Sequence, residues 1–506
     1  MKEPALADAR AVARRALELY EDDEATVALV KAYDQRLQGP LRIALAGMIK
    51  AGKSTLLNAM LGEAIAATDA GECTRVVTWY RRSNTPTITL HPHEGPPRGL
   101  RFRREDGRVV IDLGSATADE VAWIDVGWPS ESLRSVILID TPGIASLSKE
   151  VSARATGFLT QKGNASAADA VIYLMRHLRS SDRQFLETFR DAAAGGSLTV
   201  NAVAVLSRAD EIGSARIDSL LSAGQVAQRY ADDGDLRSLV LDVIPVAGLL
   251  AETARTLREE EYRALAEIAG LERSAREKLL VSADRFARPS DATSLSEAMR
   301  RELLSRFGLF GIRLSSALIR GGAKTSTTLA EGLIQQSGFN ALQAMVRDHF
   351  RARADTLKVY GVLPGLEQVI RERPRLGSDA LLAEIERIFA TTHSLRELAA
   401  LSLTRAGGYP LPSERLLEAE RIVGGGGASV AARLGLSESA DAGGEAVRER
   451  AEQLLSQWRS IAESPLTERA AVGLCHIVIR SLEQIASDRG RGSVPLLVPD
   501  DVVLPG

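Results

Sequence analysis

The sequence has few cysteines, few aromatic residues and almost no net charge. Cys73 and Cys475 stand far apart among 506 residues, so there is neither a disulfide framework nor the paired spacing of a zinc site. The net charge of −3 excludes the strongly basic field of a typical nucleic-acid-binding protein, and we expect no nucleic-acid partner. Aromatic residues make up 4%, whereas Ala, Leu, Arg and Glu abound, which favours helix over sheet in much of the chain.

Long apolar runs are also lacking. No run approaches the roughly 20 residues that cross a bilayer, and the first residues, MKEPALADAR, contain no apolar core like that of a signal peptide. We therefore expect a soluble, cytoplasmic protein, in which any membrane contact is peripheral and lies on the inner face of the cell membrane. A chain of 506 residues exceeds one compact core, so we expect two or more domains.

Apolar patterning predicts three parts. Residues 1–38 form one or two helices, ended by Gly39 and Pro40, that join a neck. Residues 39–250 alternate strands and helices, which predicts an α/β domain with a mixed, mostly parallel sheet. Residues 251–506 carry helical periodicity with no fixed repeat, which predicts an all-α neck and stalk.

Within the α/β part, continuous apolar runs predict buried parallel strands at residues 135–140, 170–175, 200–206 and 239–245. Residues 76–81 and 85–91 are predicted to pair with each other across a short turn. The Pro-, Gly- and Arg-containing segment 95–107 is predicted to be a mobile insertion.

The most informative motif is GMIKAGKST, residues 47–55, between a predicted strand and a predicted helix. Gly47 and Gly52 allow the backbone to approach phosphate oxygens closely. The helix N-terminus adds unpaired N–H donors, Lys53 places a charge against the β- and γ-phosphates, and the Ser54 hydroxyl is a magnesium ligand. This loop predicts a nucleotide-triphosphate site made by Gly47, Lys50, Ala51, Gly52, Lys53, Ser54 and Thr55.

Two further positions predict the magnesium and γ-phosphate contacts. DTPG begins with Asp140 directly after an apolar strand, where a carboxylate can hold magnesium and the Gly143 N–H can reach the γ-phosphate. Thr74 lies in the loop after the first helix, where its hydroxyl can bind magnesium and close over the nucleotide as a switch. Thr68 and Thr78 are competing candidates for that role, and a polar loop residue or strand cap is the alternative interpretation.

The motif SRAD, which follows the apolar run at residues 200–206, predicts guanine recognition. Asp210 can accept hydrogen bonds from both guanine N1–H and the 2-amino group, a donor pair that adenine lacks. Ser207 and Arg208 belong to the same motif, and the aliphatic part of Arg208 can cover the base plane. A capped turn, with Asp210 starting a helix, is the alternative. Backbone amides of Ala247 and Gly248 are expected to contact the base.

The order and spacing of these motifs resemble those of a GTPase domain. KAGKSTLLNAMLG (residues 50–62) and VGWPSESLRSVILIDTPG (residues 126–143) are similar to bacterial dynamin-like proteins. Within that superfamily the chain looks most like the actinobacterial isoniazid-inducible group. The resemblance implies a GTPase head with GTP or GDP and Mg²⁺, a neck built from both chain ends, and a stalk whose tip can touch lipid. It also implies self-association through the heads, or pairing with another dynamin-like protein.

The chain departs from this pattern at the positions that orient the attacking water. Ile49 stands where the superfamily often has a glutamine, and Ile144 follows DTPG; neither side chain can orient water. That task is then left to the Thr74 carbonyl, the Gly143 N–H or a partner subunit. Lys50 is a candidate cation for charge that develops between the β- and γ-phosphates, and a solvent-facing loop lysine is the alternative. We therefore name Lys50, Lys53, Thr74 and Gly143 as candidate catalytic residues.

Two apolar stretches are candidates for a lipid-contacting tip. Residues 307–314 combine apolar side chains with glycines, although close helix packing in a core is the commoner role of such a stretch. Residues 358–364 form a predicted apolar break between helices, with Arg351 and Arg353 nearby to meet anionic lipids.

The sequence therefore predicts a dynamin-like GTPase that hydrolyses GTP and couples hydrolysis to membrane binding or remodelling through a helical stalk. One alternative is a GTP-dependent switch that recruits a protein partner without bending a membrane. Another is a structural assembly protein that hydrolyses GTP poorly, which Ile49 and Ile144 would suit.

Overall fold

The computed structural model describes residues 4–66, 76–105, 108–143, 167–194, 200–212, 216, 218–437 and 444–488. The chain forms two compact units, Met1–Ile388 and Phe389–Gly506. Both sequence-predicted boundaries, after residues 38 and 250, fall inside the first unit. The functional division into head, neck and stalk stays a prediction.

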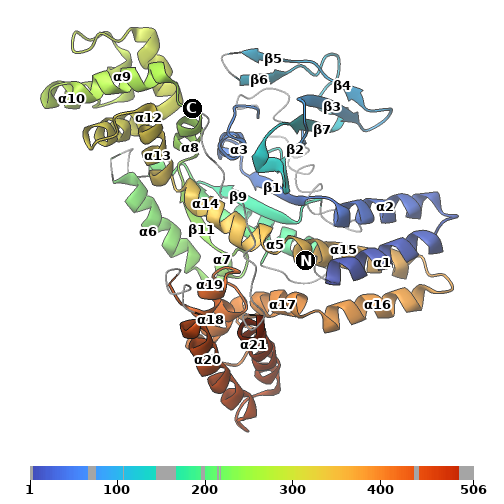
Figure 1. Ribbon diagram of the computed structural model, residues 1–506. Helices are drawn as coiled ribbons and strands as arrows, with labels where there is room; N and C mark the ends of the chain where they lie inside the picture. Colours follow the sequence, from blue (N-terminus) through green and yellow to red (C-terminus); the bar gives the residue numbers. More distant parts are fainter. Residues whose placement is uncertain are drawn as a thin grey trace. The chain divides into compact units, whose positions relative to one another are not determined.

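The first unit is built on a mixed, mostly parallel sheet (Figure 1), which in the described part of the chain has nine strands in the order β11-β10-β9-β1-β8-β2-β7-β3-β4. The predicted apolar runs form its parallel, almost wholly buried strands β8 to β11, which flank β1. Because β2 is antiparallel to β8, the sheet is mixed. The strands are β1 (Leu41–Gly47), β2 (Thr78–Arg82), β3 (Thr87–Pro92), β4 (Arg98–Gly99), β7 (Val121–Trp128), β8 (Val136–Asp140), β9 (Ala170–Met175), β10 (Ala202–Ser207) and β11 (Val243–Val246).

The predicted pairing of β2 with β3 is wrong. β7 lies between them, parallel to β2 and antiparallel to β3, so that Ile124 is opposite both Thr78 and Leu90. A short turn between two strands predicts a local hairpin. Here the alternating apolar residues Ile124 and Val126, both fully buried, give β7 the central place instead.

The segment predicted as a mobile insertion contains regular structure. Residues 98–99 form the edge strand β4. Next, β5 (Phe102–Glu105) pairs antiparallel with β6 (Arg108–Ile111) as a ribbon separate from the main sheet (Figure 1). All four residues of β5 are exposed, which explains why no apolar alternation marked this strand in the sequence.

Helices from distant parts of the sequence pack together in the first unit. α1 (Pro4–Leu19) and α2 (Glu24–Gln38) both pack on α15 (Ala354–Glu372). The Tyr20 hydroxyl donates to the Arg373 carbonyl over 2.7 Å. Gly361 and Gly365 permit the close approach, because a Cβ there would lie 2.7 Å from the Arg36 guanidinium and 2.6 Å from the Tyr33 hydroxyl.

The remaining helices of the first unit cover the sheet or form a cluster around a second apolar core beside α8. They are α3 (Lys53–Leu61), α5 (Ser180–Ala194), α6 (Ser219–Ala231), α7 (Gly234–Arg237), α8 (Gly248–Arg255), α9 (Glu259–Gly270), α10 (Arg273–Leu279), α11 (Ala283–Ala287), α12 (Glu297–Arg320), α13 (Ser326–Gln336), α14 (Phe339–Met345) and α16 (Ser378–Thr391).

Neither stretch predicted as a lipid tip is exposed. Residues 307–314 lie in α12, where Phe307, Phe310 and Ile312 are buried in the core beside α8. Gly308 has φ 62° and ψ 172°, a conformation open only to glycine, and it bends α12. Residues 358–364 are not a break: α15 continues through Pro364, and Val362 is fully buried.

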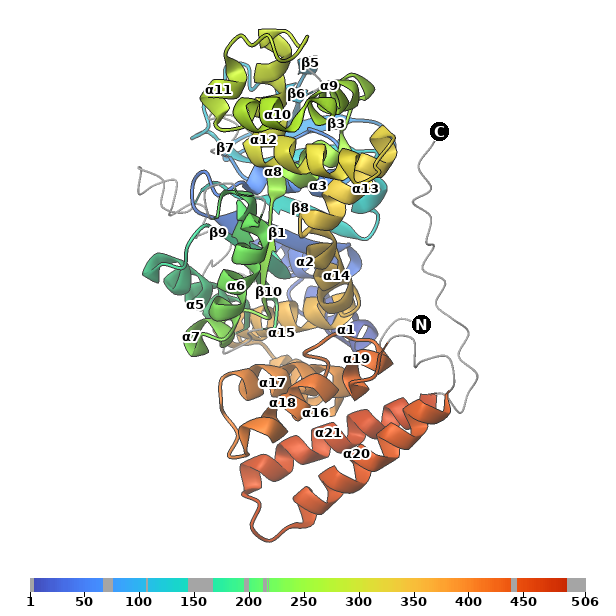
Figure 2. The same cartoon turned by 90° about the vertical axis from the view of Figure 1, so that its left-hand side faces the viewer.

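The second unit, Phe389–Gly506, is helical throughout its described residues. Its two longest helices, α20 and α21, run side by side as an antiparallel hairpin (Figure 2). Glu397 accepts hydrogen bonds from Ser481 and Arg433 inside the unit. Although burial opposes it, the hydrogen bonds and charges of His393, Ser481 and Arg433 lower the pKa of Glu397 to about 2. The unit comprises α17 (His393–Arg405), α18 (Ser413–Ile422), α19 (Val430–Leu434), α20 (Glu445–Glu463) and α21 (Arg469–Asp488).

Within the described residues, no helix of either unit has the length and apolar character needed to cross a bilayer.

Candidate nucleotide site

The phosphate loop has the predicted strand–loop–helix geometry. β1 ends at Gly47, the loop turns, and α3 begins at Lys53. Gly47 has φ 144°, and a Cβ there would lie 2.2 Å from the Leu174 carbonyl oxygen of β9. Gly52 has φ 90° and is the N-cap of α3. Both positions therefore require glycine, and the free N–H groups at the start of α3 face the loop.

Lys53, Ser54 and Asp140 meet at the carboxyl end of β1. The Lys53 ammonium donates to the carbonyls of Gly47 at 3.3 Å and Met48 at 3.4 Å. The Ser54 hydroxyl donates to Asp140 Oδ2 over 3.1 Å. Burial lowers the pKa of Lys53, while the negative charge of Asp140 opposes that shift. The arrangement places one cation, one hydroxyl and one carboxylate where the loop turns.

The backbone of Asp140 is fixed by the sheet, but its carboxylate lacks a full set of hydrogen-bond donors among the described residues. It lies opposite Leu45 in the β1–β8 register, and the next residue, Thr141, donates its hydroxyl to the Leu45 carbonyl over 2.9 Å. Asp140 Oδ1 is buried and has no hydrogen-bond partner among the described residues. Burial raises the pKa of Asp140, and Lys53 and Ser54 oppose this rise without cancelling it. Such an unpartnered carboxylate oxygen is suited to a cation or its bound water.

Gly143 closes the DTPG turn against the phosphate loop. A Cβ at this position would lie 2.4 Å from Ile49 Cγ1 and 3.0 Å from Ile49 Cα. Only glycine therefore brings the backbone after β8 this close to the loop. Ile49 is itself 45% exposed, so it lies at the surface of the site and not in the core.

The SRAD motif lies at the same edge of the sheet. The Ser207 hydroxyl donates to the Met175 carbonyl over 3.1 Å, which ties the end of β10 to β9. Arg208 adopts the left-handed conformation, with φ 55°. Its guanidinium donates to Glu211 over 2.6 Å and to the Lys50 carbonyl of the phosphate loop over 3.3 Å. Burial raises the pKa of Asp210.

A cavity of about 150 Å³ joins the phosphate loop to the SRAD motif, while Lys53, Ser54, Asp140 and Gly143 are not among the residues that line it. Its walls come from the phosphate loop and α3, the ends of β9 to β11, the SRAD motif and the start of α8. The predicted residues among its lining are Ala51, Gly52, Thr55, Ser207, Arg208, Asp210 and Gly248. The structure thus brings together sequence-distant residues that were each predicted to contact the nucleotide. Asp210 reaches this cavity from a short 3-10 turn, Ala209–Glu211, and not from the start of a longer helix.

Some predicted residues stand apart from this cavity. Lys50 is exposed, with φ 61°, at the turn of the phosphate loop. Ala247 is buried and its N–H donates to the Ser337 carbonyl over 2.9 Å, so that amide is already engaged. Thr78 lies within β2 and is buried. Thr68, Thr74 and Ile144 lie outside the described residues.

Glu211 is the one charged residue of the described lining that sequence reasoning missed. Glu211 lines the cavity and accepts from Arg208 over 2.6 Å and from Arg176 over 2.8 Å. Because Glu211 directly follows Asp210 in the sequence, it could have been predicted as a neighbour of the base. The Glu211 carboxylate thus holds the Arg208 guanidinium, which in turn donates to the Lys50 carbonyl of the phosphate loop.

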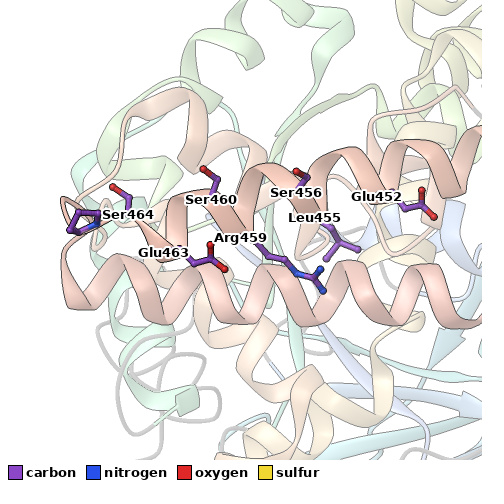
Figure 3. A pocket seen from close by; sticks show the side chains of 8 residues that line it. Glu452, Leu455, Ser456, Arg459, Ser460, Glu463 and Ser464 are labelled. Carbon is purple, nitrogen blue, oxygen red and sulfur yellow. The ribbon is translucent and has the colours of Figure 1, made fainter.

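A larger hollow, of about 860 Å³, lies along one face of α20 in the second unit (Figure 3). All of its lining residues come from α20 and the turn that follows, and acidic, hydroxyl and guanidinium groups alternate along it. Arg459 is paired with Glu483 of α21 over 2.7 Å. A single helix face with paired charges offers no convergent set of functional groups, so the smaller cavity is the candidate site.

Comparison with known proteins agrees with this geometry. The profile of the dynamin family matches residues 43–202. The isoniazid-induced protein IniC of Mycobacterium tuberculosis is 37% identical over 454 residues, which cover 90% of this chain and 91% of IniC. This chain belongs to the dynamin family. It is a bacterial dynamin-like GTPase.

More distant relatives of this dynamin-like GTPase match over shorter regions. The isoniazid-induced protein IniA of Mycobacterium tuberculosis is 25% identical over 64% of this chain and 51% of IniA. A bacterial dynamin-like protein of Nostoc punctiforme is 29% identical over 32% of this chain and 24% of that protein. A solved bacterial dynamin, described as an oligomerised pair that senses and tethers membranes, aligns with a TM-score of 0.30 and 13% identity over 97% of this chain and 76% of its own.

Proposed function

We propose that this dynamin-like GTPase binds GTP or GDP with Mg²⁺ at the carboxyl edge of its sheet and hydrolyses GTP there. The observation that carries the proposal is the meeting of Lys53, Ser54 and Asp140 next to Gly52 and Thr55, which line the same cavity as Asp210. The phosphate loop and DTPG come from the central strands, and the base-recognition motif comes from β10. This is the order in which a nucleotide extends from γ-phosphate to base.

The residues present fit Mg²⁺. Mg²⁺ prefers oxygen ligands, and Asp140 offers a buried carboxylate oxygen without a protein partner, next to the Ser54 hydroxyl. We assign Ser54 and Asp140 as residues that would hold the ion, with Thr74 as a third from its sequence position. When bound, Mg²⁺ would neutralise charge on the β- and γ-phosphate oxygens.

The protein's own contribution to hydrolysis is positioning and electrostatic stabilisation. Lys53 would neutralise the β- and γ-phosphates, and the N–H groups of the loop residues Ala51, Gly52 and Thr55 would bind their oxygens. The Gly143 N–H would meet the γ-phosphate. Because Ile49 cannot orient water, the attacking water would be held by the Thr74 carbonyl, by Gly143 or by a partner subunit.

Self-association through the GTPase domain, or pairing with another dynamin-like protein, would complete the site. Lys50 supports this proposal, because it is exposed while its carbonyl is fixed by Arg208. A side chain so placed can approach developing charge once a second protomer covers the site. Turnover per molecule should then rise with protein concentration.

Membrane contact is the second half of the proposal, and it needs a surface other than the two buried stretches. We assign it to residues 98–105, the segment that contains β4 and β5, which we name the arginine ribbon. Its four arginines are all exposed, no acidic residue occurs between 95 and 104, and Phe102 is 37% exposed beside them. Arg103 and Arg104 have acidic partners, so Arg98 and Arg101 carry most of the available charge. Each arginine near an anionic surface contributes about 1 kcal/mol.

Co-sedimentation with anionic liposomes tests this surface. The double variant Arg98→Glu/Arg101→Glu should weaken binding by at least roughly 30-fold. Leu466→Ser is the control, because Leu466 is 93% exposed at the turn between α20 and α21 but lies between Glu463 and Glu468. Loss of binding in the control alone would contradict the assignment to the ribbon.

GTP hydrolysis measured against protein concentration, with and without anionic liposomes, tests the whole proposal. We expect turnover that depends on Mg²⁺, rises with concentration and rises further with liposomes. Turnover without any liposome effect or binding would favour a switch that recruits a protein partner. GTP binding without turnover would favour a structural assembly protein, which the isoleucine at position 49 keeps open.

A further inference from the structure

Asn58 is a buried polar residue that the proposed mechanism does not use. It lies in α3, one turn beyond the phosphate loop, and is 1% exposed. Its Oδ1 accepts from the backbone N–H of Ile65 at 3.0 Å and of Ala66 at 2.7 Å. Its Nδ2 donates to the Ala66 carbonyl at 3.2 Å and to Glu252 Oε1 at 2.9 Å. These partners fix the orientation of the amide and use both of its donors and its acceptor oxygen.

Glu252 is equally unusual, because it is an acid buried to 6% exposure in α8. The groups that face it are the Asn58 amide and two guanidinium groups, Arg108 of β6 and Arg306 of α12. Burial raises the pKa of Glu252, and these three groups oppose the rise. Burying a carboxylate is costly unless it is paired, so a specific geometry must be held here.

The two helices that this pair joins are adjoining walls of the nucleotide cavity. Thr55 and Leu56 of α3 and Gly248 and Leu249 of α8 all line it. The helices are close at this level, because a Cβ on Gly248 would lie 3.8 Å from the Leu56 backbone nitrogen. Asn58 and Glu252 lie less than one turn beyond these lining residues on each helix. A change in their contact therefore changes the separation of the cavity walls.

We propose that Asn58 and Glu252 form a clamp that sets the width of the nucleotide cavity, with both acting as positioning residues for the guanine nucleotide. The inference rests on the proposed nucleotide site and adds to it a means by which α8 is held at the binding distance. Asn58 also holds the backbone of residues 65–66 to the same point. The clamp should affect GTP and GDP binding equally. It changes the positions of α3 and α8, which line the cavity, and it does not contact the γ-phosphate.

Asn58→Asp is the most direct test, because it places a second carboxylate against Glu252 in a buried site. The two acids repel, α3 and α8 separate, and the affinity for GDP should fall about tenfold, as expected for one lost buried hydrogen bond. The double variant Asn58→Asp/Glu252→Gln restores the hydrogen bond between positions 58 and 252 with donor and acceptor exchanged, although not the bond that Asn58 donates to the Ala66 carbonyl. Its GDP affinity should return to within roughly threefold of the wild type.

The pH dependence of Asn58→Asp separates the clamp from a general loss of stability. As the pH is lowered, one of the two facing carboxyls takes up a proton and the hydrogen bond re-forms. GDP affinity of the variant, relative to the wild type at each pH, should therefore recover at the acid end. The double variant has one carboxyl at this point and should follow the wild type throughout.

Asn201→Asp is the matched control. Asn201 is also a buried asparagine, 6% exposed, and it donates to the Asp169 carbonyl at the opposite edge of the sheet. Its substitution should lower Tm without changing GDP affinity or its pH dependence. If Asn58→Asp does not fold, Glu252→Ala carries the test, because it removes the α8 partner and leaves the bonds to residues 65–66.

Isothermal titration with GDP decides among the outcomes. Unchanged affinity in Asn58→Asp or Glu252→Ala, an equal loss in Asn201→Asp, or no recovery in the double variant would each overturn the clamp. A wild-type protein that binds no GDP would overturn the proposed site instead, so the two failures are distinguishable.

Discussion

The two edges of the central sheet differ in whether the protein supplies hydrogen-bond partners for their carboxylates. At the amino edge, Asp169 lies at the start of β9, and its carboxylate accepts from Arg36 over 2.7 Å and from the Arg42 N–H over 2.8 Å. At the carboxyl edge, Asp140 accepts from Ser54 alone and keeps one oxygen without a protein partner. Asp169 is buried and Asp140 is half-buried with a buried Oδ1, but only Asp169 is satisfied by the described residues.

The backbone shows the same contrast. At the carboxyl edge Lys50 and Arg208 adopt positive φ, which costs energy for residues other than glycine. At the amino edge Arg36 also donates to the Ala168 carbonyl, and its side chain is 4% exposed in a pair with a fully buried carboxylate. The amino edge joins the α2 helix to the sheet, whereas the carboxyl edge keeps groups available for a ligand. Stability and function are thus placed at opposite ends of the same strands.

Asp169→Ala should have the largest effect of the substitutions considered. It removes the carboxylate that faces the buried Arg36 guanidinium, which should lower the free energy of unfolding by about 3–5 kcal/mol. GDP affinity at a temperature where the variant is folded should not change, since the site lies at the other edge. Urea unfolding and GDP titration together check this, and a loss of affinity in folded protein would contradict the separation of the two edges.

Lys53→Ala should have the next largest effect, and this effect should fall on nucleotide binding and turnover and not on stability. Removing the cation should lower GTP affinity or turnover by roughly 100-fold. The urea midpoint should change little, because among the described residues the Lys53 ammonium donates only to two loop carbonyls. Nucleotide affinity that survives this substitution would remove the basis of the phosphate site.

Asp140→Asn should stabilise the protein while weakening its Mg²⁺-dependent turnover of GTP. Since burial raises the pKa of Asp140 above 3.8, the folded state binds more protons than the unfolded state as the pH passes from 3.8 to the raised pKa. The free energy of unfolding therefore falls as the pH rises through that window, and the loss persists at neutral pH. Asparagine carries no charge and avoids this loss.

The expected gain is roughly 1 kcal/mol at pH 7, without nucleotide or Mg²⁺. Urea unfolding of both proteins at pH 4, 5.5 and 7 measures it, and the difference should grow with pH. A less stable variant at pH 7 would show that the chain itself satisfies Asp140, contrary to the contrast between the edges.

Lys50→Ala should have the smallest effect and only under one condition. At low protein concentration its turnover should equal that of the wild type, because the side chain is exposed and lies outside the cavity lining. At high concentration the rise in turnover should be several-fold smaller. Equal turnover at every concentration would leave Lys50 as a solvent-facing loop residue.

Much of the carboxyl edge could be predicted from the sequence, because its signals are local. Each motif pairs an apolar strand with the polar residue that follows it, and parallel strands bring those residues to one edge. Gly47 was predicted to allow close backbone approach and Gly143 to present its N–H to the γ-phosphate, and the structure shows which neighbours a Cβ at either position would meet. The α/β head and the helical remainder were also correctly predicted.

The features that were wrongly predicted or missed depend on contacts between residues far apart in the sequence. β7 lies between β2 and β3, a choice made by shared burial of its apolar residues and not by the turn that joins the other two. The apolar stretches at 307–314 and 358–364 are buried by helices far away in the sequence. The Arg36–Asp169 pair and the Asn58–Glu252 contact join residues 133 and 194 positions apart, and no local pattern marks either one.

Displacement of a fluorescent GDP by unlabelled GTP and by unlabelled ATP tests the central claim most directly. The account predicts that GTP displaces the probe at least roughly 100-fold more effectively than ATP, because the Asp210 carboxylate would be left unpaired against adenine. Equal displacement by the two nucleotides would contradict a guanine site at the carboxyl edge.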